Sequence, residues 1–246
     1  MTARSPGRER RLATLRASLV ASELDGLLVT SLPNIRYLTG FSGSTALLLV
    51  TALDTILFTD FRYQTQVVAE SGDVATVVIE ATSLWTRLWS VLPQRPKVEA
   101  LAFESAHLVH ADFQRLLDAG ARWNWRPSVN LVEILREQKD DEEVAHIRDA
   151  VHIAESALEI TLPQVGQGMS ELEIGGLLES ALRRAGSEAF PFETIVATGE
   201  RSALPHARCS TRRVQNGEFL LLDFGAVSGG YCSDITRTVH VGSVPS

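Results

Sequence analysis

A short charged stretch divides the 246-residue sequence into two hydrophobic regions. The stretch reads Leu135-Arg136-Glu137-Gln138-Lys139-Asp140-Asp141-Glu142-Glu143. A charged stretch between two hydrophobic regions is a candidate domain boundary, and a chain of this length can form one large or two modest domains. We therefore predict a domain boundary after Leu135, with domains at residues 1–135 and 136–246.

The first region alternates between helical and strand patterns. A helical pattern from Leu12 to Gly26 leads into a short apolar strand candidate at Leu27–Thr30. Further strand candidates lie at Ser44–Thr51, Thr55–Thr59, Val74–Ile79, Ala100–Phe103 and Arg122–Trp125, with helical segments near Leu84–Leu92 and Asp112–Leu117. Strands that alternate with helices are typical of a mixed or parallel sheet covered by helices. The first domain is therefore predicted to be α/β.

Two helix starts with reciprocal capping signals open the second region. Asp140 is followed three residues later by Glu143, and Ser170 by Glu173. At this spacing, the first side chain and the later carboxylate can each accept a hydrogen bond from the other residue's backbone amide. Apolar residues then recur at intervals of three and four, and the first helix ends before Pro163. Strand candidates follow at Phe192–Ala197, Glu218–Phe224 and Tyr231–Val241, so we predict an α+β second domain.

Charge and apolar patterning exclude several classes of partner. The formal net charge of −7 leaves no cationic surplus for a nucleic-acid backbone. The longest apolar stretch, Ala46–Leu53, is far shorter than the ~20 residues of a membrane-spanning helix. The basic start of the chain is not followed by the continuous apolar run of a signal peptide. Cys209 and Cys232 lack C-x-x-C spacing, so we interpret them as small, partly buried apolar side chains in a reducing, cytoplasmic setting.

Two aspartates bracket the turn between the last two strand candidates. Asp223 ends the apolar run Phe219–Leu222, Asp234 begins the next strand, and a turn centred within Ala226–Gly230 would place the two directly opposite each other. Their Cβ atoms would then lie about 4.5–5.5 Å apart. At an effective dielectric constant of about 20, their repulsion would be on the order of 3 kcal/mol. A protonated carboxyl, a bound divalent cation or a cation pair would relieve it. The alternative is an Asp223 that caps the turn beside an exposed Asp234 paired with Arg237.

The residues around this pair resemble a known family. The segments Asn216-Gly217-Glu218, Leu221-Leu222-Asp223-Phe224-Gly225 and Gly230-Tyr231-Cys232-Ser233-Asp234-Ile235-Thr236-Arg237-Thr238 resemble the metal-binding hairpin of the pita-bread metallopeptidases, in the branch of Xaa-Pro aminopeptidases and prolidases. Upstream, Phe192–Gly199, Ser202–His206 and the charged stretch Leu135–Glu143 are similar to other parts of that catalytic domain. Asn34–Phe41 and Thr59–Tyr63 are similar to its creatinase-type N-terminal domain.

The resemblance implies a fold and a reaction. The fold would be an α/β creatinase-type N-terminal domain followed by the first half of an α+β pita-bread catalytic domain. Asp223 and Asp234 would bind two divalent metal ions, together with one histidine and two glutamates from the second half of that domain. Mostly oxygen ligands favour manganese, with cobalt or zinc as alternatives. A metal-held hydroxide would attack the peptide carbonyl.

The resemblance also implies roles for two further residues. His206, which follows Pro205, would bind the substrate or move a proton, although a histidine outside this context is more often structural. Phe192 would line the substrate pocket, and a place in the hydrophobic core is its alternative.

The sequence contains no carboxylate after Asp234, and His240 would lie roughly 20 Å from it along an extended strand. We therefore expect the late metal ligands to be missing, either from a fragment of a longer protein or from a naturally shortened relative. Such a chain would not be active alone. The leading hypothesis is a metal-dependent Xaa-Pro aminopeptidase that acts on proline-containing peptides. A Xaa-Pro dipeptidase (prolidase) and a non-catalytic pita-bread binding module are the alternatives, and a homodimer is expected from the family.

Overall fold

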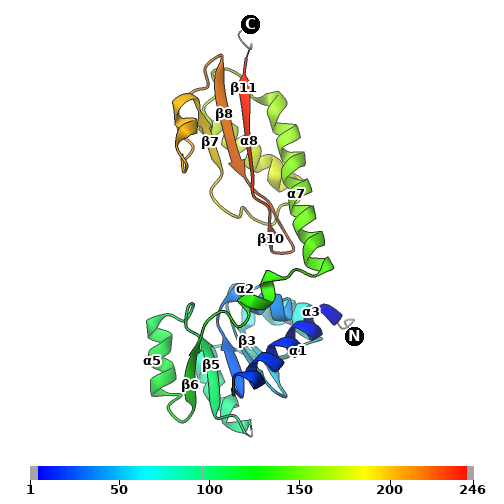
Figure 1. Ribbon diagram of the computed structural model, residues 1–246, viewed down its shortest axis with the longest axis vertical. Helices are drawn as coiled ribbons and strands as arrows, with labels where there is room; N and C mark the ends of the chain where they lie inside the picture. The colour runs from blue at the N-terminus through cyan, green and yellow to red at the C-terminus, as the bar shows by residue number, and fades with distance from the viewer. Residues whose placement is uncertain (1–4, 96, 243–246) are drawn as a thin grey trace. The chain divides into compact units, whose positions relative to one another are not determined.

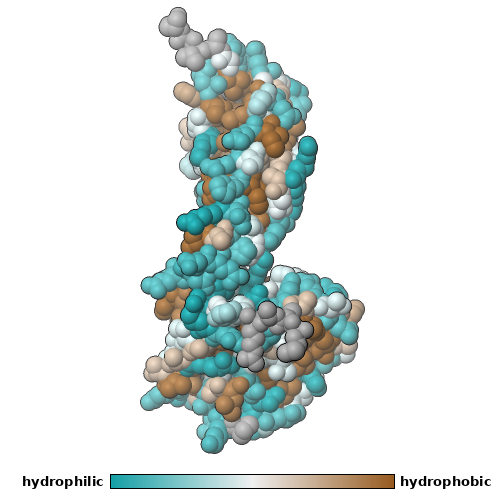
Figure 2. Space-filling view, turned by 90° about the vertical axis from the view of Figure 1, so that its right-hand side faces the viewer, coloured by the Kyte–Doolittle hydropathy of each residue, from teal (hydrophilic) through white to brown (hydrophobic). Residues whose placement is uncertain are grey.

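Two compact units make up the structure. The computed structural model describes residues 5–95 and 97–242, and the chain divides into Met1–Gln138 and Lys139–Ser246 (Figure 1). Each unit contains a sheet covered by helices and has its own hydrophobic core. The face shown in Figure 2 is mainly hydrophilic and carries separate apolar patches. Within the described ranges, no helix has the length and apolarity to cross a membrane.

The boundary between the units follows the short helix α6 (Glu133–Glu137). Tyr37 Oη donates a hydrogen bond of 3.0 Å to the backbone O of Leu135. Val132, just before α6, is buried in a core of the first unit. These contacts attach α6 to the first unit, so the division falls after Gln138 instead of after Leu135.

A six-stranded mixed sheet forms the centre of the first unit. Its strands are β1 (Gly26–Val29), β2 (Ala46–Thr51), β3 (Thr55–Asp60), β4 (Thr76–Glu80), β5 (Ala100–Glu104) and β6 (Asn124–Ser128). They lie in the order β4-β3-β2-β1-β5-β6, with β2 antiparallel to β1 and β3 and the other neighbours parallel. This arrangement confirms the predicted α/β class of the first domain.

Helices pack on both faces of this sheet. They are α1 (Pro6–Ala21), α2 (Leu32–Thr39), α3 (Gln64–Ser71), α4 (Leu84–Val91), α5 (His110–Asp118) and α6, with 3₁₀ turns at Phe61–Tyr63 and Leu92–Gln94. Successive residues of β1 face different cores. Leu27 lies in the same core as Leu15 of α1. Leu28 lies in the other core, with Leu88 of α4 and Leu116 of α5. Burial on both faces explains why the central strands are continuous apolar runs.

The four tryptophans of the sequence meet in one cluster of the first unit. The ring centroid of Trp89, on α4, lies 5.9 Å from that of Trp85 and 6.2 Å from those of Trp123 and Trp125. Aromatic pairs at such distances contribute about 0.5–1.5 kcal/mol beyond the area that they bury. The cluster therefore holds α4 against the segment that forms the edge strand β6.

Two helices and a three-stranded antiparallel sheet form the second unit (Figure 1). The helices are α7 (Asp141–Thr161) and α8 (Glu171–Arg184), with 3₁₀ turns η3 (Leu162–Gln164) and η4 (Gly199–Ala203). The strands are β7 (Ile195–Thr198), β8 (Glu218–Phe224) and β11 (Ile235–Val241), in the order β11-β8-β7. Both predicted capping boxes are present, at Asp140 with Glu143 and at Ser170 with Glu173.

Burial alternates along the central strand β8. Leu220, Leu222 and Phe224 are fully buried in a core that includes Ala154 of α7 and Leu178 of α8. The residues between them point away from the helices, as expected for a sheet with one covered face. Asp223 belongs to this second, uncovered set.

A tight hairpin leads from β8 to β11. Its two short strands are β9 (Val227–Ser228) and β10 (Tyr231–Cys232). Gly229 and Gly230 between them have φ angles of +58° and +82°, and positive φ at both central residues defines a type I′ turn. The ring of Tyr231 stacks on that of His146 with centroids 5.7 Å apart, and Tyr231 Oη donates to Glu143 Oε1 at 2.7 Å. The hairpin is thus fixed against α7.

The two cysteines are free thiols in different surroundings. Cys209 is half-buried against Gly175 of α8, and burial raises the pKa of its thiol. Cys232 is exposed at the end of β10. The interpretation as partly buried apolar side chains therefore describes Cys209 but is wrong for Cys232.

Candidate metal and substrate site

An open cavity of about 400 Å³ lies on the uncovered side of the second unit's sheet. It is lined by Phe192, Glu193, Ile195, His206, Arg208, Asp223 and Asp234. The structure therefore brings together all of the residues that the sequence singled out for a site. They come from the segment before β7, the connection between β7 and β8, the end of β8 and the segment before β11.

Asp223 occupies a defined position on the central strand. Its neighbours across the sheet are Ile195 on β7 and Thr236 on β11. Asp223 Oδ1 accepts a hydrogen bond of 3.1 Å from Thr236 Oγ1. A carboxylate can accept several such bonds, so one partner leaves it with capacity for further ligands.

The register of β8 and β11 differs from the predicted one. Asp223 pairs with Thr236, and the predicted placement directly opposite Asp234 is wrong. The turn is centred on Gly229–Gly230, one residue later than predicted, which moves every pairing by two positions. In a regular antiparallel ladder, such diagonal neighbours have Cα atoms about 7–8 Å apart. The repulsion estimated for a facing pair therefore does not apply, although both side chains still line the cavity.

Asp234 is placed by a close approach of two backbone segments. Ser233 N donates to Ala226 O at 2.9 Å, and Ala226 N donates to Ser233 Oγ at 3.0 Å. Ser233 Oγ in turn donates to Ala150 O of α7 at 3.0 Å. Because these bonds fix Ser233, they also fix the backbone from which the exposed Asp234 reaches the cavity.

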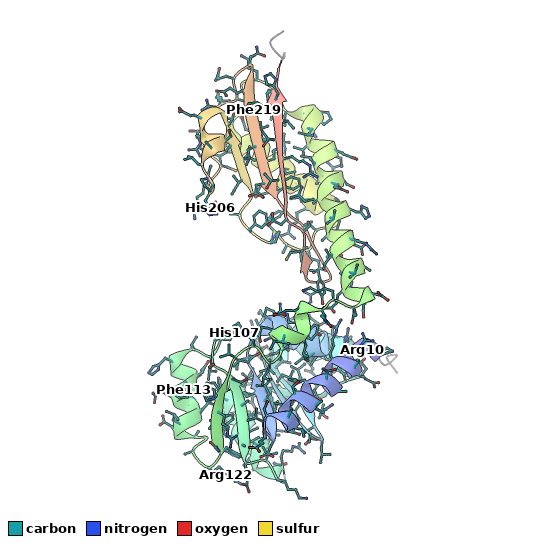
Figure 3. All side chains as sticks on the ribbon, in the orientation of Figure 1. Arg10, His107, Phe113, Arg122, His206 and Phe219 are labelled. Carbon is teal, nitrogen blue, oxygen red and sulfur yellow. The ribbon has the colours of Figure 1, made fainter. Side chains whose placement is uncertain are left out.

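His206 and Phe192 lie on opposite sides of β7 in the sequence and at the same cavity in space. His206 is exposed on the connection between β7 and β8 (Figure 3), whereas Phe192 is half-buried. The structure adds lining residues that the sequence did not single out. Arg208 Nε forms an ion pair with Glu193 Oε2 at 3.2 Å, between side chains that are 82% and 62% exposed.

The oxygen donors of Asp223 and Asp234 fit a divalent cation in kind but not in number. Carboxylates suit hard cations such as manganese or magnesium, and an octahedral site takes about six ligands. Over the described part of the chain, no group of three or more His, Cys, Asp or Glu side chains is arranged to hold a metal ion. The two aspartates can therefore supply only part of a coordination sphere.

Glu218 holds the beginning of the strand that carries Asp223. Its carboxylate oxygens lie 2.9 and 2.5 Å from the two terminal nitrogens of Arg212. Gln215 N and Thr198 Oγ1 also donate to it, each at 3.0 Å. The hydrogen bonds of Arg212, followed by those of Gln215 and Thr198, lower the pKa of Glu218 from 4.5 to about 2.

Glu218→Gln removes one charge of this ion pair and is therefore expected to lower the free energy of unfolding at pH 7. The expected loss is only on the order of 1 kcal/mol, because the pair is partly exposed and screened by solvent. A depressed pKa in the folded state stabilises the fold above the ordinary pKa of 4.5, and this stabilisation disappears as the pH falls toward 2. The difference between wild type and variant should therefore shrink across that window in urea unfolding followed by circular dichroism. Glu159→Gln, on an exposed position of α7, is the control. A difference that does not change with pH would contradict the assignment.

Comparisons with known protein families match both units of the chain. The family model for the creatinase/prolidase N-terminal domain matches residues 11–138. The model for metallopeptidase family M24 matches residues 145–246. Residues 139–144, which lie between the two matches, contain the start of α7 and directly follow the boundary between the compact units.

Individual relatives extend the likeness over nearly the whole chain. The chain is 34% identical over 219 residues to a Bacillus subtilis (strain 168) protein named "Uncharacterized peptidase YqhT". The aligned region covers 89% of this chain and 62% of the relative. The solved Xaa-Pro dipeptidase from Bacillus anthracis superposes with a TM-score of 0.88 at 32% identity, over 97% of this chain and 66% of that one. The X-Pro aminopeptidase from Thermotoga maritima MSB8 superposes with a TM-score of 0.85 at 30% identity, over 95% and 66%. The chain thus spans slightly under two thirds of the length of these relatives.

Proposed function

Because the chain belongs to the creatinase/prolidase family, with an N-terminal creatinase/prolidase domain followed by an M24 metallopeptidase domain, we propose that its whole protein is a metal-dependent Xaa-Pro aminopeptidase. It would hydrolyse the bond between an N-terminal residue and a following proline. The observation that carries this proposal is the single cavity that contains Asp223, Asp234, His206 and Phe192.

Four of the cavity residues have roles that their chemistry supports. Asp223 and Asp234 would hold part of a pair of divalent cations, for which manganese is proposed and cobalt or zinc are alternatives. When bound, the cations would supply a nucleophile near neutral pH and polarise the scissile carbonyl. His206, exposed at the cavity wall, would bind the substrate or move a proton at the reacting amide. The half-buried ring of Phe192 offers an apolar surface to the substrate.

The site leaves two substrate classes to be distinguished, because the structural relatives include both a dipeptidase and an aminopeptidase. An aminopeptidase must accept a chain that continues beyond proline, whereas a dipeptidase binds the free carboxylate of proline. A cytoplasmic location, which rests on the spacing of the two cysteines, and a homodimer, which rests on the family resemblance, are further proposals.

The proposal is tested by assaying the whole protein with a Xaa-Pro-Yaa tripeptide and a Xaa-Pro dipeptide. With manganese present, hydrolysis of the tripeptide is expected, and a chelator should abolish it because the cations supply the nucleophile. Preference for the dipeptide would identify a prolidase instead. No hydrolysis of either peptide with manganese, cobalt or zinc would overturn the proposal.

Residues 1–246 alone provide the matched comparison. Because two carboxylates cannot complete either coordination sphere, this chain is expected to bind manganese weakly and to hydrolyse neither peptide. Isothermal titration calorimetry with manganese measures the binding. Tight stoichiometric binding would show that the described residues form a more complete site than their geometry indicates.

A further inference from the structure

The connection that carries His206 is attached to the first turn of α8. We call residues 199–212 the His206 loop. Glu171 N donates to Arg212 O at 3.0 Å, and Leu172 N donates to Ser210 O at 3.1 Å. Amides at a helix start have no partner within the helix, so the end of the loop satisfies two of these donors. The loop is thus bound to a rigid element of the core.

The Glu171 side chain binds both ends of this loop. Its carboxylate is completely buried. Thr198 N donates to it at 3.0 Å, and Arg201 Nε lies 3.1 Å from both of its oxygens. On the other side, Ser210 N donates at 3.0 Å and Ser210 Oγ at 2.6 Å. One carboxylate therefore joins the beginning of the loop to its end.

Arg201 extends this connection to the cavity wall. While its Nε binds Glu171, its Nη2 donates to the backbone O of Arg208 at 2.7 Å. Arg208 lines the cavity two residues after His206. The planar guanidinium presents its donors in a fixed geometry, so it can hold the two acceptors at a defined separation. The backbone that follows His206 is therefore held in place by the buried carboxylate.

We propose that Glu171 is a positioning residue of the cavity, which acts through Arg201 and Ser210 to hold His206 and Arg208 in the cavity wall. A buried carboxylate is costly to desolvate, and an apolar residue would often stabilise a fold equally well. The donors that converge on Glu171 all belong to the His206 loop or to Thr198 next to it. The contribution to catalysis rests on the proposed function, whereas the order of the loop does not.

The test compares Glu171→Gln with Glu173→Gln in the whole protein. In Glu171→Gln, the new side chain would place an amide donor among groups that already donate, so the loop should open more often. Glu173 lies in the same turn, but its side chain is exposed and binds Ser170 and Arg213, which lie outside the loop. Trypsin cleavage after Arg208, relative to cleavage after the exposed Arg184, is expected to rise about tenfold or more in Glu171→Gln, because the substitution leaves a buried donor of the loop unpaired. It should stay unchanged in Glu173→Gln.

Catalysis provides a readout that general destabilisation would not reproduce. In Glu171→Gln, kcat for the Xaa-Pro substrate should fall while the apparent manganese affinity stays unchanged, because Asp223 and Asp234 lie outside the loop. If Glu171→Gln does not fold, Arg201→Lys decides the outcome, because lysine keeps the charge and cannot bridge Glu171 and Arg208 in the same geometry. Unchanged cleavage after Arg208 in a folded variant would overturn the proposal. If the wild-type protein hydrolyses no Xaa-Pro peptide, the proposed function fails and the cleavage assay still tests the loop.

Discussion

Asp223→Asn in the whole protein is expected to lower kcat/KM for a Xaa-Pro-Yaa peptide by about 100-fold or more, since even residues that only orient metal ligands cost 10–100-fold when changed. Asparagine keeps the shape of the side chain and can still accept the hydrogen bond of Thr236. It removes the negative charge that a divalent cation requires from its carboxylate ligands. The loss should therefore be accompanied by weaker manganese binding without a loss of folding.

The measurement is a manganese titration of activity, with circular dichroism to confirm that the fold is retained. Asp149→Asn, on an exposed position of α7, is the matched control because it removes the same charge from the same unit and Asp149 does not line the cavity. It is expected to leave both activity and manganese dependence unchanged. Wild-type activity in Asp223→Asn would contradict the assignment of Asp223 as a ligand.

Gly225→Ala is expected to destabilise the second unit by on the order of 3 kcal/mol, near the upper end of typical overpacking costs. An added Cβ would overlap the backbone O of Ser233 and lie 2.6 Å from Pro191 Cγ. Ser233 cannot withdraw easily, because it is hydrogen-bonded to Ala226 and to Ala150 of α7. Any relief of the overlap should also displace Asp234, the next residue, and weaken metal binding.

Urea unfolding followed by circular dichroism measures this effect. The control is Gly176→Ala, at an exposed position of α8 where an added Cβ has no neighbour within 4 Å. Because alanine is the better helix former, this control should stabilise the unit by about 0.5–1 kcal/mol. Equal stability of Gly225→Ala and the wild type would show that the two backbone segments can separate without cost.

The helices of the second unit could be predicted because their starts are encoded locally. The spacing of Asp140 with Glu143 and of Ser170 with Glu173 predicts two capping boxes, and both form. Strand β8 was predicted with the bounds that the structure has. Capping and apolar alternation depend on neighbouring residues only, so a single sequence is sufficient to identify them.

The β8–β11 register could not be predicted correctly from the position of the aspartates alone. Gly229-Gly230 forms a type I′ turn, and this glycine pair was the signal that would have given the observed pairing. Helix α2 (Leu32–Thr39) was also missed, although Pro33 near its start and Gly40, with φ of +82°, after its end mark both limits. Both omissions concern turn and cap chemistry that was present in the sequence.

The composition of the cavity depends on tertiary structure. Asp223, Asp234, His206 and Phe192 were predicted through their resemblance to a family, and the structure places all four at one cavity. Arg208 was not predicted, because its place in the wall depends on the bridge through Arg201 to Glu171, which lies far away in the sequence. Local patterns carry no information about such a bridge.

The tryptophan cluster has a consequence for spectroscopy of this protein. All four indoles lie in the first unit, and the second unit contains Tyr231 as its one aromatic fluorophore besides phenylalanine. Intrinsic fluorescence excited at the red edge of the indole absorption band therefore reports on the first unit alone. A tryptophan introduced beside the cavity would consequently report on the second unit. Its signal would be the emission of the variant minus that of the unsubstituted chain, with the four native indoles as an internal reference.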